Sequence, residues 1–274
     1  MTAAAIRTPG RTSFARVIAT HQSRDVLRKR WVLWYALCLV LAGDLLLRLA
    51  GSAPSALVSL LNVVLLLVPL IALILGSASL YSAREFTELL LVQPIPRRTL
   101  FIGLYLGLTL PLLVATELGI ALPFAIERAL DAATLPMLFM LMLISGLLVC
   151  VFTAIAFVIT VRVRDRARGL GVAILVWLCL GLLYDGLVLA IATTFRDWPI
   201  ERGMLGAMLL NPIDLARTIL LLRLDVAALM GYTGAVFRLA FGSRTGLLLA
   251  FGVLIAWIVV PWQLGARAFD RRDF

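Results

Sequence analysis

Six apolar runs, each about twenty residues or longer, constrain this chain more than any other feature of its sequence. They lie at roughly residues 31–50, 56–80, 100–126, 136–161, 169–195 and 245–265. A helix needs about 20 apolar residues to cross the hydrocarbon core of a bilayer, and lipid offers no partner to an unpaired backbone amide. The runs therefore predict an all-α integral membrane protein with six transmembrane helices. The composition agrees, because the chain is 62% hydrophobic whereas a soluble domain is about half apolar.

The basic residues are distributed unevenly between the segments that join these runs. Of the 25 Lys and Arg residues, 17 fall in residues 1–30, 81–99, 162–168 and the C-terminal tail. Because Lys and Arg are enriched in cytoplasmic segments, both termini are predicted to be cytoplasmic. The same placement attributes the net charge of +10 to topology and to contact with membrane lipid, not to nucleic-acid binding.

The segment before the first run is predicted to contain an amphipathic helix. Thr12 and Ser13 are typical N-cap residues, and Phe14, Val17 and Ile18 fall on one face among arginines. A basic amphipathic helix lies in the membrane plane. We therefore expect a cytoplasmic tail and elbow helix over 1–30. A signal peptide cleaved near "LAGSAPSA" is the alternative, although a 30-residue lead-in is long for one.

Residues 196–244 are too apolar for a free loop and are predicted to lie on the outer side. They read as two short interfacial or re-entrant helices, interrupted at Asn211-Pro212 and around 231–234. Asp214 and Arg217 are separated by three residues, as neighbours on a helix are. Two additional transmembrane helices, giving eight, are the alternative.

Two acidic residues within the predicted spans are candidate functional residues. Glu117 lies inside the third run between Pro111 and Pro123, and Asp185 lies in the fifth run. Ionisable groups in a bilayer face a bundle interior or a cavity, because exposure to lipid is costly. These residues either line a pathway or connect helices.

The chain lacks the residues that several kinds of chemistry require. The chain has one lysine, Lys29, and no G-x-x-x-x-G-K-[ST] loop, so it is not expected to hydrolyse a nucleotide itself. Its one histidine and three cysteines have no metal-binding spacing. We therefore predict neither an enzyme nor a metal site. Any energy for transport is expected from a partner.

A charged segment after the second run resembles the corresponding segment of ABC-2 type permeases. The family pattern approximates E-R-E-x-G-T-x-E-x-L-L followed by P-[IV]-[ST]-R, and "AREFTELLLVQPIPRR" matches much of it. The usual glycine is absent, and Pro96 replaces a hydroxyl residue. The resemblance implies a homodimer of permeases with two cytoplasmic P-loop ATPase subunits that hold ATP and Mg²⁺. It also implies a coupling helix in this segment, formed by Arg84, Glu85, Phe86, Glu88, Leu89, Leu90, Pro94, Arg97 and Arg98.

The residues of this segment give the coupling hypothesis a physical basis. Glu85 and Glu88 are three residues apart, while the apolar residues between and after them fall on another side. This pattern is typical of a helix that docks in a groove of a partner. Pro94 and Pro96 then end the helix. The alternative is a solvated loop.

A narrower resemblance is to NosY-type permeases, which serve maturation of the copper–sulfur centre of nitrous oxide reductase. It rests on "LVWLCLGLLYDGLVLA", "NPIDLARTILLL" and "GYTGAVF". It implies a bacterial inner-membrane protein with a NosF-like ATPase and a periplasmic β-helical, NosD-like partner. That partner is expected to dock at Asn211, Pro212, Asp214 and Arg217.

The resemblance leaves several functions open for the permease domain, which is predicted to span 31–265 and to precede a cytoplasmic tail at 266–274. The domain either moves a sulfur or copper species or transmits motion to the periplasmic partner. The alternatives are an exporter of another solute, such as a drug or lipid, and a proton-coupled secondary transporter that uses the intramembrane acids.

Overall fold

The computed structural model describes residues 11–84, 96–132, 134–194, 201–223 and 244–271. Regular structure in these ranges is helical throughout. Six helices are long and apolar enough to span a bilayer. Five are α2 (Arg30–Leu49), α3 (Ala53–Ser82), α5 (Arg97–Ile126), α6 (Thr134–Arg162) and α12 (Arg244–Asp270), and the sixth combines α7 (Arg166–Leu178), η1 (Cys179–Leu183) and α8 (Tyr184–Thr194).

These helices confirm the prediction of an all-α, multi-pass membrane protein. Two short helices lie within the segment predicted to be outside, α9 (Glu201–Leu209, 9 residues) and α10 (Pro212–Arg223, 12 residues). Each is shorter than a bilayer requires. Residues 224–243 lie outside the described part of the chain, so the described residues do not supply the additional pair of spans.

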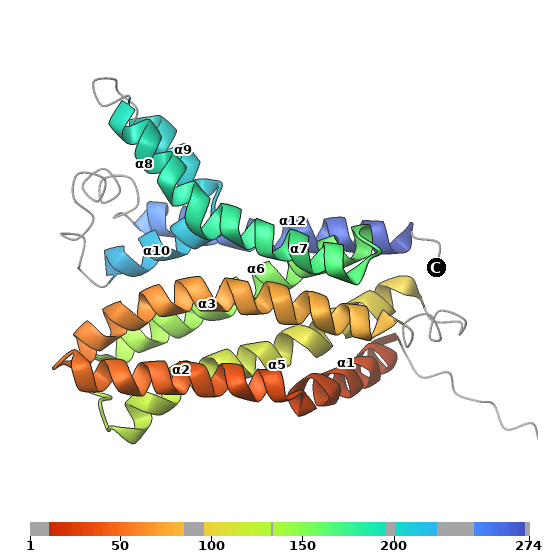
Figure 1. The fold of residues 1–274 in the computed structure, drawn as a ribbon, viewed down its shortest axis with the longest axis horizontal. Coiled ribbons are helices and arrows are strands. Elements are labelled where there is room, and N and C mark those ends of the chain that lie inside the picture. The colour runs from red at the N-terminus through yellow and green to blue at the C-terminus, as the bar shows by residue number, and fades with distance from the viewer. Residues whose placement is uncertain (1–10, 85–95, 133, 195–200, 224–243, 272–274) are drawn as a thin grey trace, which may run out of the picture.

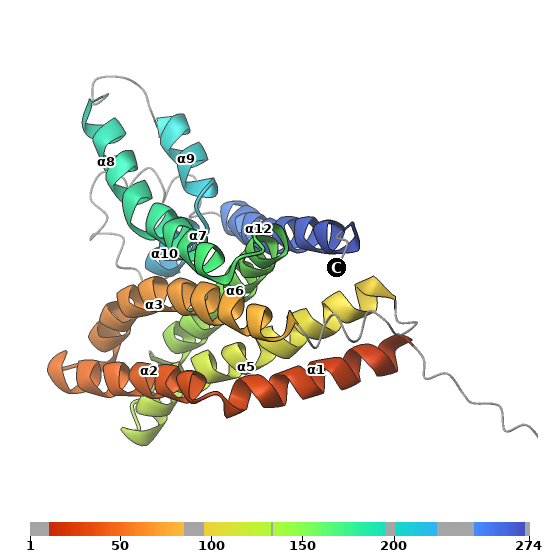
Figure 2. The ribbon, with the colours of Figure 1, turned by 45° about the vertical axis from the view of Figure 1, so that its right-hand side comes forward.

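Helices α5 and α6 form the centre of the bundle. Helix α2 and the N-terminal helix α1 (Arg11–Arg28) pack against α5, whereas α3 and α12 pack against α6. Helix α7 lies along α3, and α8 projects away from the bundle together with α9 (Figures 1 and 2). The largest buried aromatic side chains belong to the two central helices: Phe101 and Phe124 on α5, and Phe152 and Phe157 on α6.

Glycines allow the helices beside α5 to approach its backbone. A Cβ atom at Gly119 would lie 2.7 Å from Leu39 Cβ of α2, and one at Gly103 would lie 2.9 Å from Ile18 Cβ of α1. Both distances are too short for carbon atoms in contact. Small residues therefore determine the spacing here, as is common between membrane helices.

The N-terminal helix exists as predicted, and one side of it packs against α5. Ile18, Gln22 and Val26 are buried, whereas Val17 is 64% exposed. The residues that pack against α5 thus follow a four-residue repeat that begins at Ile18. The placement of α1 in the membrane plane remains a prediction.

Candidate functional site

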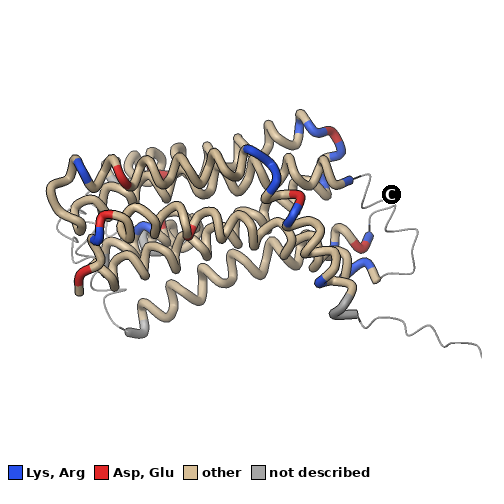
Figure 3. Tube along the Cα trace, turned by 90° about the horizontal axis from the view of Figure 1, so that it is seen from below, with Lys and Arg blue, Asp and Glu red and all other residues tan. Residues whose placement is uncertain are grey.

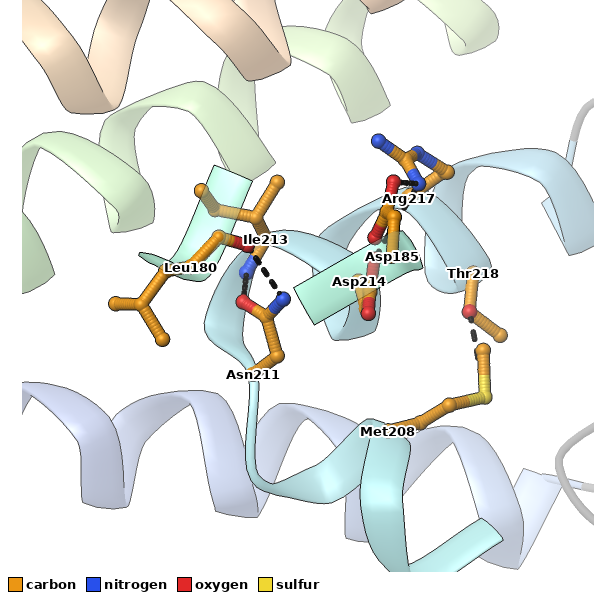
Figure 4. Close-up of polar contacts among 8 residues, drawn as sticks. All are labelled: Leu180, Asp185, Met208, Asn211, Ile213, Asp214, Arg217 and Thr218. Carbon is orange, nitrogen blue, oxygen red and sulfur yellow. Dashed lines mark hydrogen bonds and ion pairs between the residues drawn. The ribbon is translucent and has the colours of Figure 1, made fainter. Parts of the chain in front are cut away.

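A polar cluster joins α8 to α10 and contains one of the intramembrane acids together with two predicted docking residues. Arg217 Nη1 donates to Asp185 Oδ2 at 2.6 Å and to Asp214 Oδ1 at 3.3 Å (Figure 4). The side chains of Arg217 and Asp185 are about one-third exposed, at 32% and 37%, whereas that of Asp214 is 10% exposed. The guanidinium group of Arg217 therefore pairs with two carboxylates that lie on different helices.

The start of α10 positions Asp214 and Arg217. Asn211 immediately precedes the helix, and its Oδ1 accepts a hydrogen bond from Ile213 N at 3.0 Å. Pro212 occupies the first helical position, where its missing N–H has no cost. Asp214 follows in the first turn, where the helix dipole favours a negative charge. Asn211-Pro212 is thus a helix start as well as the interruption inferred from the sequence.

A π-helical turn positions Asp185. Within the fifth span, η1 inserts a wider turn directly before α8, and such turns contain one residue more than an α-helix would. Asn211 Nδ2 donates to the Leu180 carbonyl of this turn at 2.7 Å (Figure 4). Tyr184, the first residue of α8, donates its hydroxyl to the Ala207 carbonyl of α9. The bulge, α8, α9 and the start of α10 are therefore tied together by side chains.

The charge of this cluster depends on Asp214. Burial, together with the hydrogen bond and negative charge of Asp185, raises the pKa of Asp214 to about 7, although Arg217 and Asn211 oppose the shift. Asp214 lies in α10, outside the six candidate spans. It is consequently a carboxyl group that gains or loses a proton near neutral pH.

The predicted docking residues are directed into the chain. Asn211 is fully buried, Asp214 is nearly so, and Pro212 is buried as well. Docking of a periplasmic protein at these residues stays a prediction. Their described contacts hold α10 against the fifth span. No sequence pattern indicated that Asn211 would contact Leu180 or that Arg217 would pair with Asp185.

Glu117 is separate from this cluster. It lies on α5, where Ser145 Oγ of α6 is 3.5 Å from its Oε1. Its Oε2 atom is buried and has no hydrogen-bond partner among the described residues. The two intramembrane acids thus occupy different environments, since one is ion-paired and the other is not.

The predicted coupling segment is described only at its ends. Glu85, Phe86, Glu88, Leu89, Leu90 and Pro94 lie outside the described residues. Arg84 Nη1 donates to the Arg164 carbonyl between α6 and α7 at 2.9 Å. At the other end, Arg97 Nη1 donates to the Asp270 carbonyl of α12 at 2.8 Å, and Arg98 Nε lies 3.9 Å from Asp270 Oδ2. One end is therefore hydrogen-bonded to the connection between α6 and α7, and the other end to α12.

The described side chains form no metal centre of a usual kind. Across the described ranges, no group of three or more His, Cys, Asp or Glu residues could hold a metal ion. The polar cluster suits charge pairing and proton exchange.

Comparison with known proteins identifies the family. The family model described as ABC-2 family transporter protein matches residues 16–274. The chain belongs to the ABC-2 transporter family. Two relatives of this ABC-2 protein are each named probable ABC transporter permease protein NosY. The one from Pseudomonas aeruginosa is 30% identical over 271 residues, and the one from Stutzerimonas stutzeri is 29% identical over 273 residues. Each alignment covers 93% of this chain and 97% of the relative.

These relatives confirm the resemblance predicted from the sequence. The ABC-2 protein is a permease subunit of the NosY type, and a permease subunit is not itself an enzyme. A permease of an ABC transporter works with an ATPase. The matched region begins within α1 and includes the polar cluster and the C-terminal end of α12.

Proposed function

We propose that this chain is the membrane subunit of an ATP-driven transporter that serves maturation of the copper–sulfur centre of nitrous oxide reductase. The observation that carries the proposal is the similarity to NosY permeases along 93% of the chain. In this proposal both termini are cytoplasmic in a bacterial inner membrane. ATP and Mg²⁺ are held by two copies of a NosF-like ATPase.

The segment between Arg84 and Arg97 is the proposed contact with the ATPase. Its flanking arginines hydrogen-bond the Arg164 and Asp270 carbonyls. A displacement of the segment would therefore act on the connection between α6 and α7 and on the end of α12, in addition to α3 and α5. This arrangement supports a coupling role, because several helices are linked to one short segment.

Glu85→Ala combined with Glu88→Ala tests this contact. We expect the double variant to insert normally and to lose at least tenfold in affinity for the cognate ATPase, as measured by co-purification of the two proteins. The matched control is Glu127→Ala, which removes a carboxylate beyond the opposite end of α5. If the ATPase binds the double variant and the parent equally, the segment is not its docking site.

A second copy of the permease is the proposed neighbour of the fifth span. None of the 18 residues in the most apolar stretch of Arg166–Ile191 is buried within the chain, although this run contains Leu175, Leu182 and Leu187. A homodimer would cover this face. Light scattering of the protein in a mild detergent should give the mass of two chains, and Leu182→Arg should shift it toward one. A monomeric parent protein would contradict the proposal.

The outer ends of α8, α9 and α10 are the proposed contact for a NosD-like periplasmic protein. The position of the Asn211–Arg217 turn beside the projecting helices α8 and α9 supports this role. Capture of the β-helical partner by the full chain should be weakened when residues 201–209 are replaced by a Gly/Ser linker. Unchanged capture would exclude this surface.

The proposal includes two modes of action, which one experiment separates. In one, a sulfur or copper species crosses the membrane, and in the other, ATPase motion is transmitted to the periplasmic partner without transport. Vesicles containing the complete complex should accumulate the species only in the first mode. Partner rearrangement that depends on ATP hydrolysis, without accumulation, identifies the second.

A further inference from the structure

The side of the bundle between α5 and α6 contains an open cavity that the proposed function does not use. Its volume is about 340 Å³, and Leu113 and Glu117 of α5 line it together with residues of α6. On α6 the lining runs from Phe139 to Cys150, about 16 Å at 1.5 Å per residue. The cavity is therefore a cleft three turns long, and Glu117 is its one carboxyl group.

The carboxylate of Glu117 is incompletely satisfied at this site. Within the described part of the chain, its Oε2 atom is buried without a hydrogen-bond partner, and its Oε1 atom has only the long 3.5 Å contact with Ser145. Glu117 lies nine residues before the end of α5, about 13 Å from the outer end of that helix and thus near the middle of a bilayer. A carboxylate at this depth requires a cation or a proton.

Because Gly146 has no side chain, it leaves space for the carboxylate of Glu117. A Cβ atom at this position would lie 3.0 Å from Glu117 Oε1. A larger residue would therefore displace the carboxylate from its present position.

The dimensions and lining of the cleft define the ligand. A bare metal ion fills only a small part of 340 Å³, whereas ligands of drug size occupy pockets of about 300–1,000 Å³. Apart from Glu117 the lining is mainly aliphatic, with the thioether of Met142, the thiol of Cys150 and the exposed ring of Phe139. Aromatic rings attract organic cations, and one carboxylate balances one positive charge.

We propose that this cleft binds a lipophilic organic cation of charge +1. The charged centre pairs with Glu117, and the apolar body lies along α6 between Phe139 and Cys150. The site is independent of the function proposed above, because it contains neither the polar cluster of α10 nor the coupling segment. A lipid acyl chain in the same cleft is the competing occupant, and it would not require the negative charge.

Binding of radiolabelled tetraphenylphosphonium to the full chain in phosphatidylcholine nanodiscs tests the proposal. The parent protein should bind it saturably, with displacement by unlabelled tetraphenylphosphonium but not by neutral tetraphenylsilane. Glu117→Gln preserves the size of the side chain and should weaken binding at least tenfold. Glu127→Gln removes a carboxyl group just beyond the end of the same helix and should leave binding unchanged.

Two further variants separate loss of the site from loss of the fold. Phe139 is 67% exposed, so Phe139→Ala should preserve thermal stability and weaken binding several-fold. Gly146→Val should fill the space beside Glu117 and abolish binding. Absence of saturable binding to the parent, equal binding by Glu117→Gln, or displacement by tetraphenylsilane would each overturn the proposal, and the last would identify a site for neutral apolar chains.

Discussion

Arg217 connects two carboxylates that are 29 residues apart in the sequence, Asp185 and Asp214. Partly buried charges contribute less through mutual attraction than they cost when one partner is removed. Arg217 therefore lowers the free-energy cost of placing the carboxylates of Asp185 and Asp214 close together.

Replacement of Arg217 by Gln should destabilise the packing of α10 against α8. We expect a loss of about 1–3 kcal/mol, because two carboxyl groups would remain without their cation. The apparent Tm of the purified protein should fall by several degrees. A second change, Asp185→Asn, should restore part of the loss by removing the repulsion. An Arg217→Gln variant as stable as the parent would show that the ion pairs contribute nothing.

The protonation of Asp214 should make stability depend on pH. Its pKa is raised from 3.8 to about 7 in the folded protein, so the folded state holds the proton more tightly than the unfolded state. The contribution of this group to stability is thus greatest below about pH 4, falls as the pH rises toward 7, and is constant above that.

Asp214→Asn should remove this component of the pH dependence. The Tm of the parent and of the variant, measured between pH 4.5 and 8, should converge at the acidic end and diverge at the alkaline end, where the variant is more stable. Asp165→Asn, at the opposite end of the bundle, serves as the control and should follow the parent. Parallel curves for Asp214→Asn and the parent would contradict the assignment.

At the scale of helices, the close packing of α5 with α1 and α2 depends on glycines. Gly119 leaves no space for a methyl group against α2, since Leu39 Cβ would be 2.7 Å and the Ala36 carbonyl oxygen 3.3 Å away. At Gly171 on α7, no atom of the described residues lies within 4 Å of the corresponding position. The two residues form a matched pair for testing helix approach.

Gly119→Ala should destabilise the protein by about 1–3 kcal/mol, because an added methyl group forces two helices apart. Gly171→Ala should be neutral or slightly stabilising, since alanine favours a helix more than glycine does. Chemical or thermal unfolding of both variants in the same detergent provides the measurement. Equal effects at the two positions would show that helix propensity, and not spacing, controls the response.

The sequence did not predict which helices pack against one another. The three-residue spacing of Asp214 and Arg217 predicted their contact, because it follows from the period of one helix. The contact of Arg217 with Asp185 depends on how α10 lies against α8, and no local pattern encodes that. The packing of α1 against α5 could not be predicted either, since amphipathicity alone does not identify the partner.

At the scale of the whole molecule, the lengths of the apolar runs predicted the helical architecture. The six runs correspond, in the described part of the chain, to six helices that are long and apolar enough to span a bilayer. Lys and Arg residues are concentrated toward the end of the bundle that holds the C-terminus (Figure 3). The polar cluster could not be predicted in the same way. Asn211 donates to a carbonyl of the π-helical turn, and the residues of that turn, "CLGLL", carry no distinctive sequence signal.

The asymmetry of charge predicts orientation. A green fluorescent protein fused after Phe274 should fluoresce, because it folds in the cytoplasm, whereas alkaline phosphatase fused there should be inactive. Alkaline phosphatase inserted after Leu130, between α5 and α6, should be active because it reaches the periplasm. The opposite pattern would reverse the topology and would place the coupling segment on the wrong side for an ATPase.

The extra residue in η1 also affects how related chains can differ. Each residue turns a helix by about 100°, so losing one residue from Cys179–Leu183 would rotate everything after it by that angle about the axis of the fifth span. Asp185 would then leave Arg217, although no residue of α8 had been substituted. In an alignment this change would appear as a single gap. A relative with that gap would therefore present a different side of α8 to α10, even if the rest of its sequence were closely similar.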